Sequence, residues 1–183
     1  EAAERLRPVR HERQRLGVVR GRVLLRLHRG ADGRVAVGGG ASVAVQRHEL
    51  FDHTADVGVR VRAPSLAELL APATDGLYAI IGNLVADGRE AESRELELGA
   101  DEPALLLRDY LAEVLGLFEM GRRMVTAVEV REFSQTRLAV TVRLQRIDMT
   151  TSTLEREVKA VTYHELRVWP VADGYEATYI VDI

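Results

Sequence analysis

A chain of 183 residues has room for one domain with its own core, and the absence of cysteine excludes disulfides, thiolate metal sites and cysteine nucleophiles. The net charge of −3 is unevenly distributed: residues 1–47 hold eleven Arg against four acidic residues, while residues 48–183 hold fourteen basic and twenty-four acidic ones. So acidic a domain is poorly suited to direct nucleic-acid binding, and a basic protein or a metal cation is the better match.

Residues 1–47 are rich in Arg, Val and Gly and show no sustained periodicity. We expect an extension that is disordered or mis-annotated, within which residues 20–28 could form a short strand; a basic arm that contacts RNA is the alternative. The first residues lack the continuous apolar centre of a secretory signal, and no apolar run is long enough to span a bilayer. We therefore expect a cytoplasmic protein without a membrane partner.

A half-buried strand is expected at residues 57–61, where Val alternates with Gly and Arg. Ser65 and Glu68 have the spacing of a capping box, in which two side chains satisfy amides at the start of a helix. The helix is expected to continue to residue 81 and to be kinked by Pro72, which has no amide hydrogen. Its buried face should contain Leu69, Leu70, Leu77, Ile80 and Ile81.

A second helix is expected after a polar loop at residues 83–92 and a short strand at residues 95–98. Asp101 has the residue type of a helix cap, and Pro103 falls in the first turn, where a missing amide hydrogen costs nothing. Apolar residues then recur at helical spacing, which indicates one buried face. That face consists of Leu107, Leu111, Val114, Leu115 and Phe118.

After Arg123 the apolar period changes to two, which is typical of strands. Residues 125–132 and 137–145 are expected to form a hairpin, and residues 156–169 and 176–182 two further strands. The predicted fold class is α+β, with two helices packed on one face of a mainly antiparallel sheet.

Two aspartates and the last residue of the sequence are candidates for a metal site. Asp56 precedes the first predicted strand, and Asp182 and Ile183 close the last one. Two Asp side chains and the carboxylate of Ile183 would offer only oxygen ligands, which suit Ca²⁺, Mg²⁺ or Mn²⁺. His53 or His164 nearby would shift the preference toward a transition metal. From composition alone, the default explanation of each Asp is a turn residue or an exposed charge.

Lys159 is the only lysine of the chain, beside twenty-four Arg. Because an ammonium and a guanidinium are not interchangeable at a geometrically demanding site, we single this residue out. A strand at residues 157–164 would place Glu157, Lys159, Val161 and Tyr163 on one face. That face is either solvated, with a cross-strand pair, or a functional surface.

Three segments together resemble the archease family over about residues 48–183. They are His53-Thr54-Ala55-Asp56, the stretch EVKAVTYH at residues 157–164, and Val181-Asp182-Ile183 at the end of the sequence. The resemblance implies an SHS2-like α+β domain at residues 48–183. It also implies an accessory protein, not itself an enzyme, that activates an RtcB-type RNA ligase in tRNA splicing and RNA repair. Such an activator promotes the metal- and GTP-dependent guanylylation of the ligase and its multiple turnover.

The resemblance also implies roles for individual residues. The family's metal ligands fall on Asp56, Asp182 and Ile183, and its ligase-facing lysine falls on Lys159. His53 and His164 would lie near the metal or the ligase, and RNA would be reached only through the ligase. In the stretch 143–155 this sequence lacks the Gly-Glu pair and the His that usually precede the lysine motif.

Two other functions remain open from the residues alone. A stand-alone metal-dependent hydrolase would need a base beside the metal, for which His53 is the candidate. A general chaperone or adaptor would instead need an exposed apolar patch. The sequence contains no G-x-S-x-G motif and no phosphate-binding P-loop, so it gives no support to a serine nucleophile or a nucleotide site.

Overall fold

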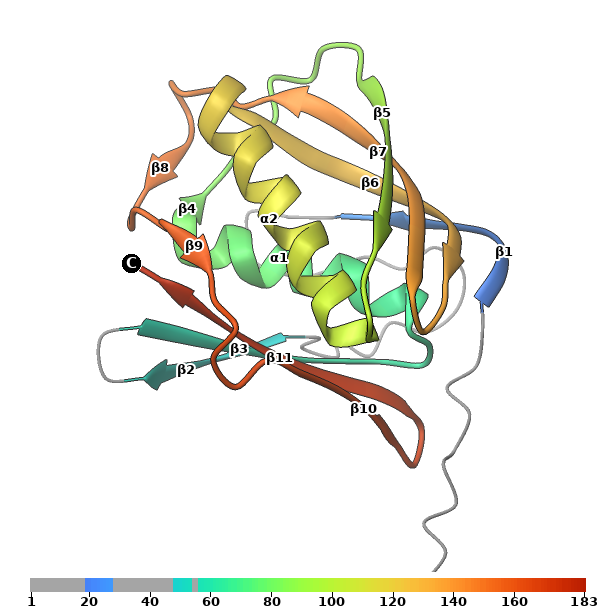
Figure 1. Cartoon of the computed structure of the whole chain (residues 1–183). Coiled ribbons are helices and arrows are strands. Elements are labelled where there is room, and N and C mark those ends of the chain that lie inside the picture. Colours follow the sequence, from blue (N-terminus) through green and yellow to red (C-terminus); the bar gives the residue numbers. More distant parts are fainter. Residues whose placement is uncertain (1–18, 28–47, 54–55) are drawn as a thin grey trace, which may run out of the picture.

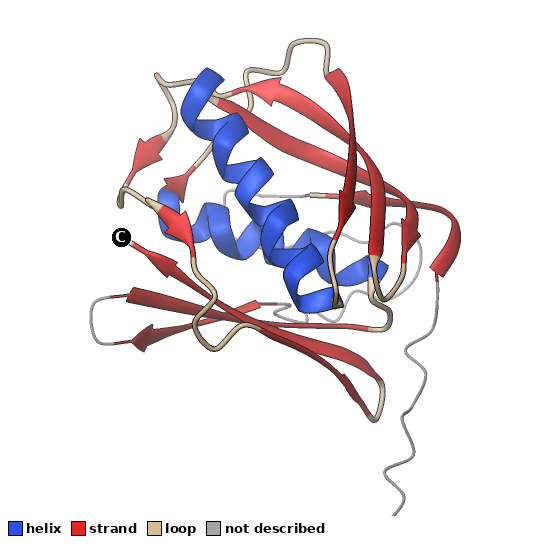
Figure 2. Cartoon of the chain, in the orientation of Figure 1, coloured by secondary structure: helices blue, strands red, loops and turns tan. Residues whose placement is uncertain are grey.

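The computed structural model describes residues 19–27, 48–53 and 56–183, which form two antiparallel sheets with two helices between them (Figures 1 and 2). The α+β prediction is confirmed, but the strands divide between two sheets where one was expected. The reason lies in helix α2 (Pro103–Gly121), whose buried residues include Leu106, Tyr110 and Leu117 as well as the predicted stripe. A helix that is apolar on more than one side has to be covered on two sides.

The first sheet has the strand order β1-β6-β7-β5. It consists of β1 (Val19–Arg26), β5 (Glu92–Gly99), β6 (Arg123–Phe133) and β7 (Arg137–Arg146). The predicted hairpin is β6 and β7, and one face of β7 is buried against the helices through Leu138, Val140, Val142 and Leu144. β1 coincides with the short strand considered at residues 20–28 and pairs with β6. The remainder of the predicted extension, residues 1–18 and 28–47, lies outside the described residues.

The second sheet carries the residues of functional interest and has the order β10-β11-β3-β2. Its strands are β2 (His48–His53), β3 (Asp56–Ala63), β10 (Arg167–Val171) and β11 (Gly174–Asp182). The two-residue strand β9 (Ala160–Val161) pairs with the last residues of β11. A separate pair, β4 (Gly82–Asn83) and β8 (Thr153–Leu154), closes the end of the first helix.

Half of the predicted capping box is present, because the Ser65 hydroxyl accepts from the Glu68 amide at 3.3 Å. The Glu68 carboxylate accepts from the same hydroxyl at 2.8 Å and not from an amide. A 3-10 turn, η1 (Ala67–Leu69), leads into α1 (Leu70–Ile81). Pro72 was expected inside the helix, where it would cause a kink. In the structure it is the third residue of α1 and so lies in the first turn of that helix. A proline in the first turn removes no helical hydrogen bond. In α2 the capping position is Glu102 and not Asp101, and its side chain makes no capping bond.

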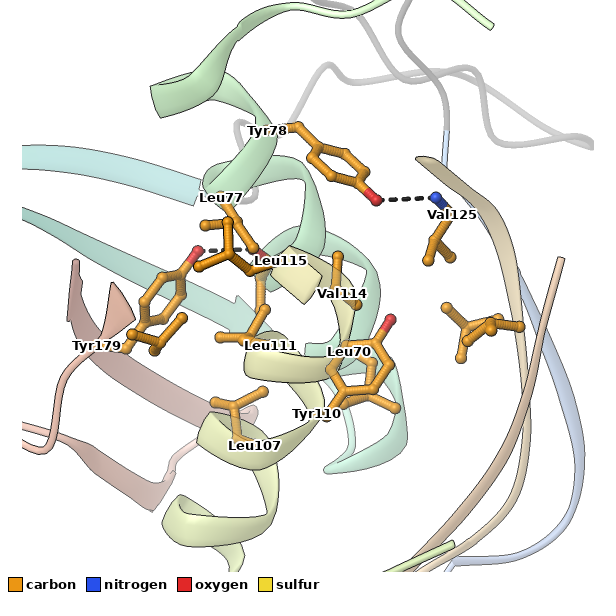
Figure 3. Packing of buried hydrophobic residues seen from close by; sticks show 14 of the residues in the cluster. Leu70, Leu77, Tyr78, Leu107, Tyr110, Leu111, Val114, Leu115, Val125 and Tyr179 are labelled. Carbon is orange, nitrogen blue, oxygen red and sulfur yellow. Dashed lines mark hydrogen bonds between the residues drawn. The ribbon is translucent and has the colours of Figure 1, made fainter. Parts of the chain in front are cut away.

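Three buried tyrosines link α1 to the elements around it (Figure 3). The Tyr78 hydroxyl accepts from the Val125 amide of β6 at 2.8 Å, and the Tyr179 hydroxyl of β11 donates to the Ala73 carbonyl at 2.6 Å. Burial raises the pKa of both Tyr110 and Tyr179 above the usual value for tyrosine. Both phenols stay neutral at physiological pH, so Tyr179 is a fixed hydrogen-bonding link between β11 and α1, and Tyr110 is one between α2 and α1.

The Thr74–Tyr110 pair gives a test of the helix–helix packing. The Thr74 hydroxyl donates to the Leu70 carbonyl at 2.8 Å and lies 2.9 Å from the Tyr110 hydroxyl, all of it buried. We expect Thr74→Val to lower the free energy of unfolding by about 1–3 kcal/mol, because it leaves a buried phenol without a partner. Adding Tyr110→Phe should cost much less than in the wild-type background. Denaturant unfolding measures both, and strictly additive losses would contradict the pairing.

The predicted strand at residues 156–169 is wrong in its extent. Only β9 and β10 are strands there, and the intervening chain is irregular. The alternating faces are wrong for the same reason, since Val158 and Val161 are buried while Lys159 and Tyr163 are exposed. Within the described ranges, no helix is long and apolar enough to cross a membrane.

Candidate metal centre

Asp56 and Asp182 lie directly opposite each other on the paired strands β3 and β11. The alternating residues Val57, Val59 and Val61 of β3 are buried against the helices, so Asp56 belongs to the other face of the sheet. Residues opposite each other in an antiparallel pair share a face, with Cβ atoms roughly 4.5–5.5 Å apart. The fold thus brings together two carboxylates from opposite ends of the domain.

The charge of this pair contrasts with the rest of the same face. Further along the two strands, Arg62 lies opposite Glu176, and the two side chains form an ion pair that a second arginine, Arg60, approaches at 3.5 Å. Asp56 and Asp182 instead carry the same charge, and no ion pair to either carboxylate occurs among the described residues. Like charges at opposed positions destabilise a sheet, so a cation between them would offset that cost.

Lys159 and Ile183 lie at the same end of β11, where Figure 1 shows the end of the chain beside β9. The Lys159 amide donates to the Asp182 carbonyl at 2.9 Å. The Lys159 ammonium donates to the main-chain oxygen of Ile183 at 3.0 Å. Asp56, Asp182, Ile183 and Lys159, all four singled out from the sequence, are therefore neighbours in the fold.

The two histidines differ in their positions. His53 is the residue of β2 opposite Asp56, so its backbone continues the row that contains both aspartates. His164 is exposed and lies two residues after Thr162. The Thr162 amide donates to the Ile180 carbonyl at 2.9 Å. The main-chain carbonyl of Glu165, the residue after His164, accepts from the Thr178 hydroxyl at 2.9 Å. His164 therefore lies level with Ile180 and Thr178, away from the Asp56–Asp182 row.

The donors at this end of the sheet fit a hard cation. They are two carboxylates and one main-chain oxygen, the ligand types of Ca²⁺, Mg²⁺ and Mn²⁺. In the part of the chain that the structure describes, no group of three or more His, Cys, Asp or Glu side chains could hold a metal. A centre at this point therefore depends on the Ile183 oxygen and on water or a partner's groups.

Sequence reasoning missed Arg108 of α2, which contacts the segment that carries Lys159. Its Nε donates to the Val161 carbonyl at 3.1 Å, and its guanidinium lies 4.5 Å from the centre of the Tyr163 ring. Arg108 falls between two residues of the apolar stripe, which drew attention only to that stripe. In the fold its side chain is only 23% exposed, but nothing in the local sequence pattern indicates this contact.

A family model matches residues 48–183, that of the Archease protein family (MTH1598/TM1083). The chain belongs to the archease family. A relative named protein archease from Thermococcus gammatolerans is 31% identical over 143 residues, covering 76% of this chain and 100% of the relative. The archease of Methanopyrus kandleri is 31% identical over 138 residues, covering 74% and 98%, and that of Methanosarcina barkeri is 28% identical over 145 residues, covering 75% and 97%.

Solved structures of the family share the fold. The solution structure of Methanobacterium thermoautotrophicum protein 1598 superposes with a TM-score of 0.62 at 22% identity, covering 76% of this chain and 100% of that one. The crystal structure of an archease and possible chaperone from Thermotoga maritima gives a TM-score of 0.54 at 22% identity, covering 73% and 94%. The resemblance inferred from three short segments thus extends over the whole archease domain.

Proposed function

We propose that this protein is a non-catalytic activator of an RtcB-type RNA ligase. In this role it promotes the metal- and GTP-dependent guanylylation of the ligase, and hence its multiple turnover in tRNA splicing and RNA repair. Membership of the archease family supports the proposal. The observation that carries it is the placement of Asp56 opposite Asp182, with Lys159 hydrogen-bonded to both of the last two residues of the sequence.

Asp56, Asp182 and the main-chain oxygen of Ile183 would hold a divalent cation, Ca²⁺, Mg²⁺ or Mn²⁺. When bound, such a cation would supply a positive centre that attracts oxygen ligands such as phosphate groups. The two carboxylates fix that centre at the end of β11, which pairs there with β3 on one side and with β9 on the other. His53, opposite Asp56, is the residue through which the centre would extend toward β2.

Lys159 would face the ligase. Its ammonium is on the surface and is held beside Ile183, so it can approach a partner without rearrangement of the backbone. A compact ammonium contacts a phosphate or carboxylate as a point charge, whereas a guanidinium demands a planar, two-pronged partner. The acidic balance of residues 48–183 favours docking to a basic protein, with RNA reached through the ligase.

A multiple-turnover assay tests the proposal. With the cognate ligase limiting and RNA in excess, added protein should raise the number of ligations per ligase, and Lys159→Ala should abolish most of that stimulation. Lys159→Arg keeps the charge but not the ammonium geometry, and we expect partial activity from it. Asp173→Ala is the matched control, since Asp173 is an exposed acidic residue in the turn before β11. Unchanged turnover in the presence of the wild-type protein would refute the role.

The same preparations separate the two alternatives. A stand-alone hydrolase would consume RNA or nucleotide without any ligase, and the activity would require Asp56 and Asp182. A general chaperone would protect unrelated unfolding proteins from aggregation, and Asp182→Ala would retain that activity. An activator of the proposed kind shows neither behaviour.

A further inference from the structure

The segment that carries Lys159 has little secondary structure of its own. Between β8 and β10, only Ala160 and Val161 are strand residues. Their pairing partners are Asp182 and Val181 of β11, and no strand among the described residues pairs with the other side of β9. A two-residue strand provides few ladder hydrogen bonds, so the position of this segment depends on side chains from other elements.

Arg108 supplies contacts on the helix side of that segment. The Nε of Arg108 donates to the Val161 carbonyl at 3.1 Å, while Val161 itself is buried opposite Val181. The guanidinium carbon lies 4.5 Å from the centre of the Tyr163 ring, a cation–π contact. Tyr163 is 65% exposed, so its ring gains this contact without being part of the core.

The guanidinium is itself fixed from the helix. Its Nη1 donates to the Asp109 carboxylate at 2.9 Å. Three groups therefore hold one planar cation: a carboxylate on α2, a main-chain carbonyl on β9 and an aromatic ring beyond it. A guanidinium can bind all three groups at once, because its N–H groups donate hydrogen bonds in the plane while its flat face stacks on a ring. A lysine ammonium has no such flat face.

We propose that Arg108 is a positioning residue for Lys159, holding β9 between α2 and β11 so that the ammonium stays beside Asp182 and Ile183. The inference deepens the function proposed above and rests on it. On either side of Val161, the Lys159 amide donates to the Asp182 carbonyl and the Thr162 amide donates to the Ile180 carbonyl, each at 2.9 Å. Releasing Val161 from Arg108 would loosen both bonds and the lysine between them.

Amide hydrogen exchange tests this placement without any ligase. We expect Arg108→Ala to speed exchange at Lys159 and Thr162 by about tenfold or more, because a charged hydrogen bond and a cation–π contact are lost together. Tyr163→Phe keeps the ring and should leave exchange unchanged, whereas Tyr163→Ala should give a smaller increase. Arg108→Lys should restore part of the protection.

Arg94→Ala is the matched control. Arg94 also reaches α2, with its Nη2 3.6 Å from the Glu113 carboxylate, but it comes from β5 and contacts no residue of the Lys159 segment that the structure describes. This variant should leave exchange at Lys159 and Thr162 at the wild-type rate. Equal acceleration by Arg94→Ala and Arg108→Ala would overturn the proposal, since it would indicate general loosening of α2.

A double-variant cycle with the ligase completes the test. Arg108→Ala should reduce the stimulation of turnover about fivefold or more in the wild-type background, and should cause no further loss when Lys159 is already Ala. A full additional loss in the Lys159→Ala background would overturn the proposal, because Arg108 would then act independently of the lysine. If the wild-type protein does not raise turnover, the ligase function fails, while the exchange experiment still decides whether Arg108 positions the Lys159 segment.

Discussion

Asp182→Ala should abolish the stabilisation of this protein by divalent cations. With the proposed centre intact, a metal at about one hundred times its dissociation constant adds about 2.7 kcal/mol to the free energy of unfolding. Asp182 supplies one of only two side-chain carboxylates in the proposed centre, so the variant should show almost none of that gain. Thermal unfolding with added Ca²⁺, Mg²⁺ or Mn²⁺, against a chelator, measures the difference and identifies the preferred cation.

The same variant should behave in the opposite way in chelator. Removing one of two like charges at opposed positions of β3 and β11 relieves repulsion, so the melting temperature without metal should equal or exceed that of the wild type. A variant that is merely misfolded would be less stable under both conditions. Asp173→Ala should respond to metal like the wild type. Retention of the full metal response by Asp182→Ala would exclude it as a ligand.

Gly82→Ala should be the most damaging single substitution at the end of α1, lowering the free energy of unfolding by about 2–4 kcal/mol. Gly82 ends the helix with φ +147°, which L side chains rarely adopt. A Cβ there would lie 2.1 Å from the Thr153 carbonyl oxygen and 3.0 Å from the Glu155 amide nitrogen. Both are main-chain atoms, so β8 itself would have to move. Denaturant unfolding measures the loss.

Gly88→Ala separates the two causes of that loss. Gly88 also has a positive φ, +73°, but a Cβ there would meet nothing within 4 Å. This control should therefore cost only the backbone strain, about 1 kcal/mol. Equal losses for the two variants would mean that β8 does not pack on Gly82. Because the Glu155 amide donates to the Ile81 carbonyl at 2.8 Å, we also expect Gly82→Ala to impair the Lys159 segment that follows.

Local pattern was sufficient to predict most of the elements. The buried stripe of α2, the β6–β7 hairpin and the Ser65 cap follow from periods and spacings within a few residues. The chain after Glu155 did not obey the same rule. There the apparent period of two came from Val and Tyr residues that are held by contacts to α2 and β11, not by a continuous ladder. A pattern within one segment contains no information about such distant partners.

For the candidate centre too, the residue types could be predicted from the sequence but the contacts between distant residues could not. Residue type made Asp56 and Asp182 candidates for one site, but nothing in the sequence around them indicates that the two residues meet, and the likeness to a family gave the stronger reason to join them. The register between β3 and β11 now supports that joining. Arg108 was missed because it contacts the Val161 carbonyl and the Tyr163 ring, both more than fifty residues further along the chain. Such contacts do not affect the spacing of apolar residues in the helix, which was the pattern used for prediction.

The position of β11 has a consequence for the order in which the protein can fold during synthesis. β11 lies between β3 and β10, yet it follows both of them in the chain. The first sheet and both helices are complete by Arg146, whereas β3 and β10 must wait for residues 174–182 to leave the ribosome. A nascent chain lacking these nine residues would present two unpaired strand edges, which are sites of aggregation. The strand that ends at the candidate centre is therefore also the one whose arrival closes the second sheet.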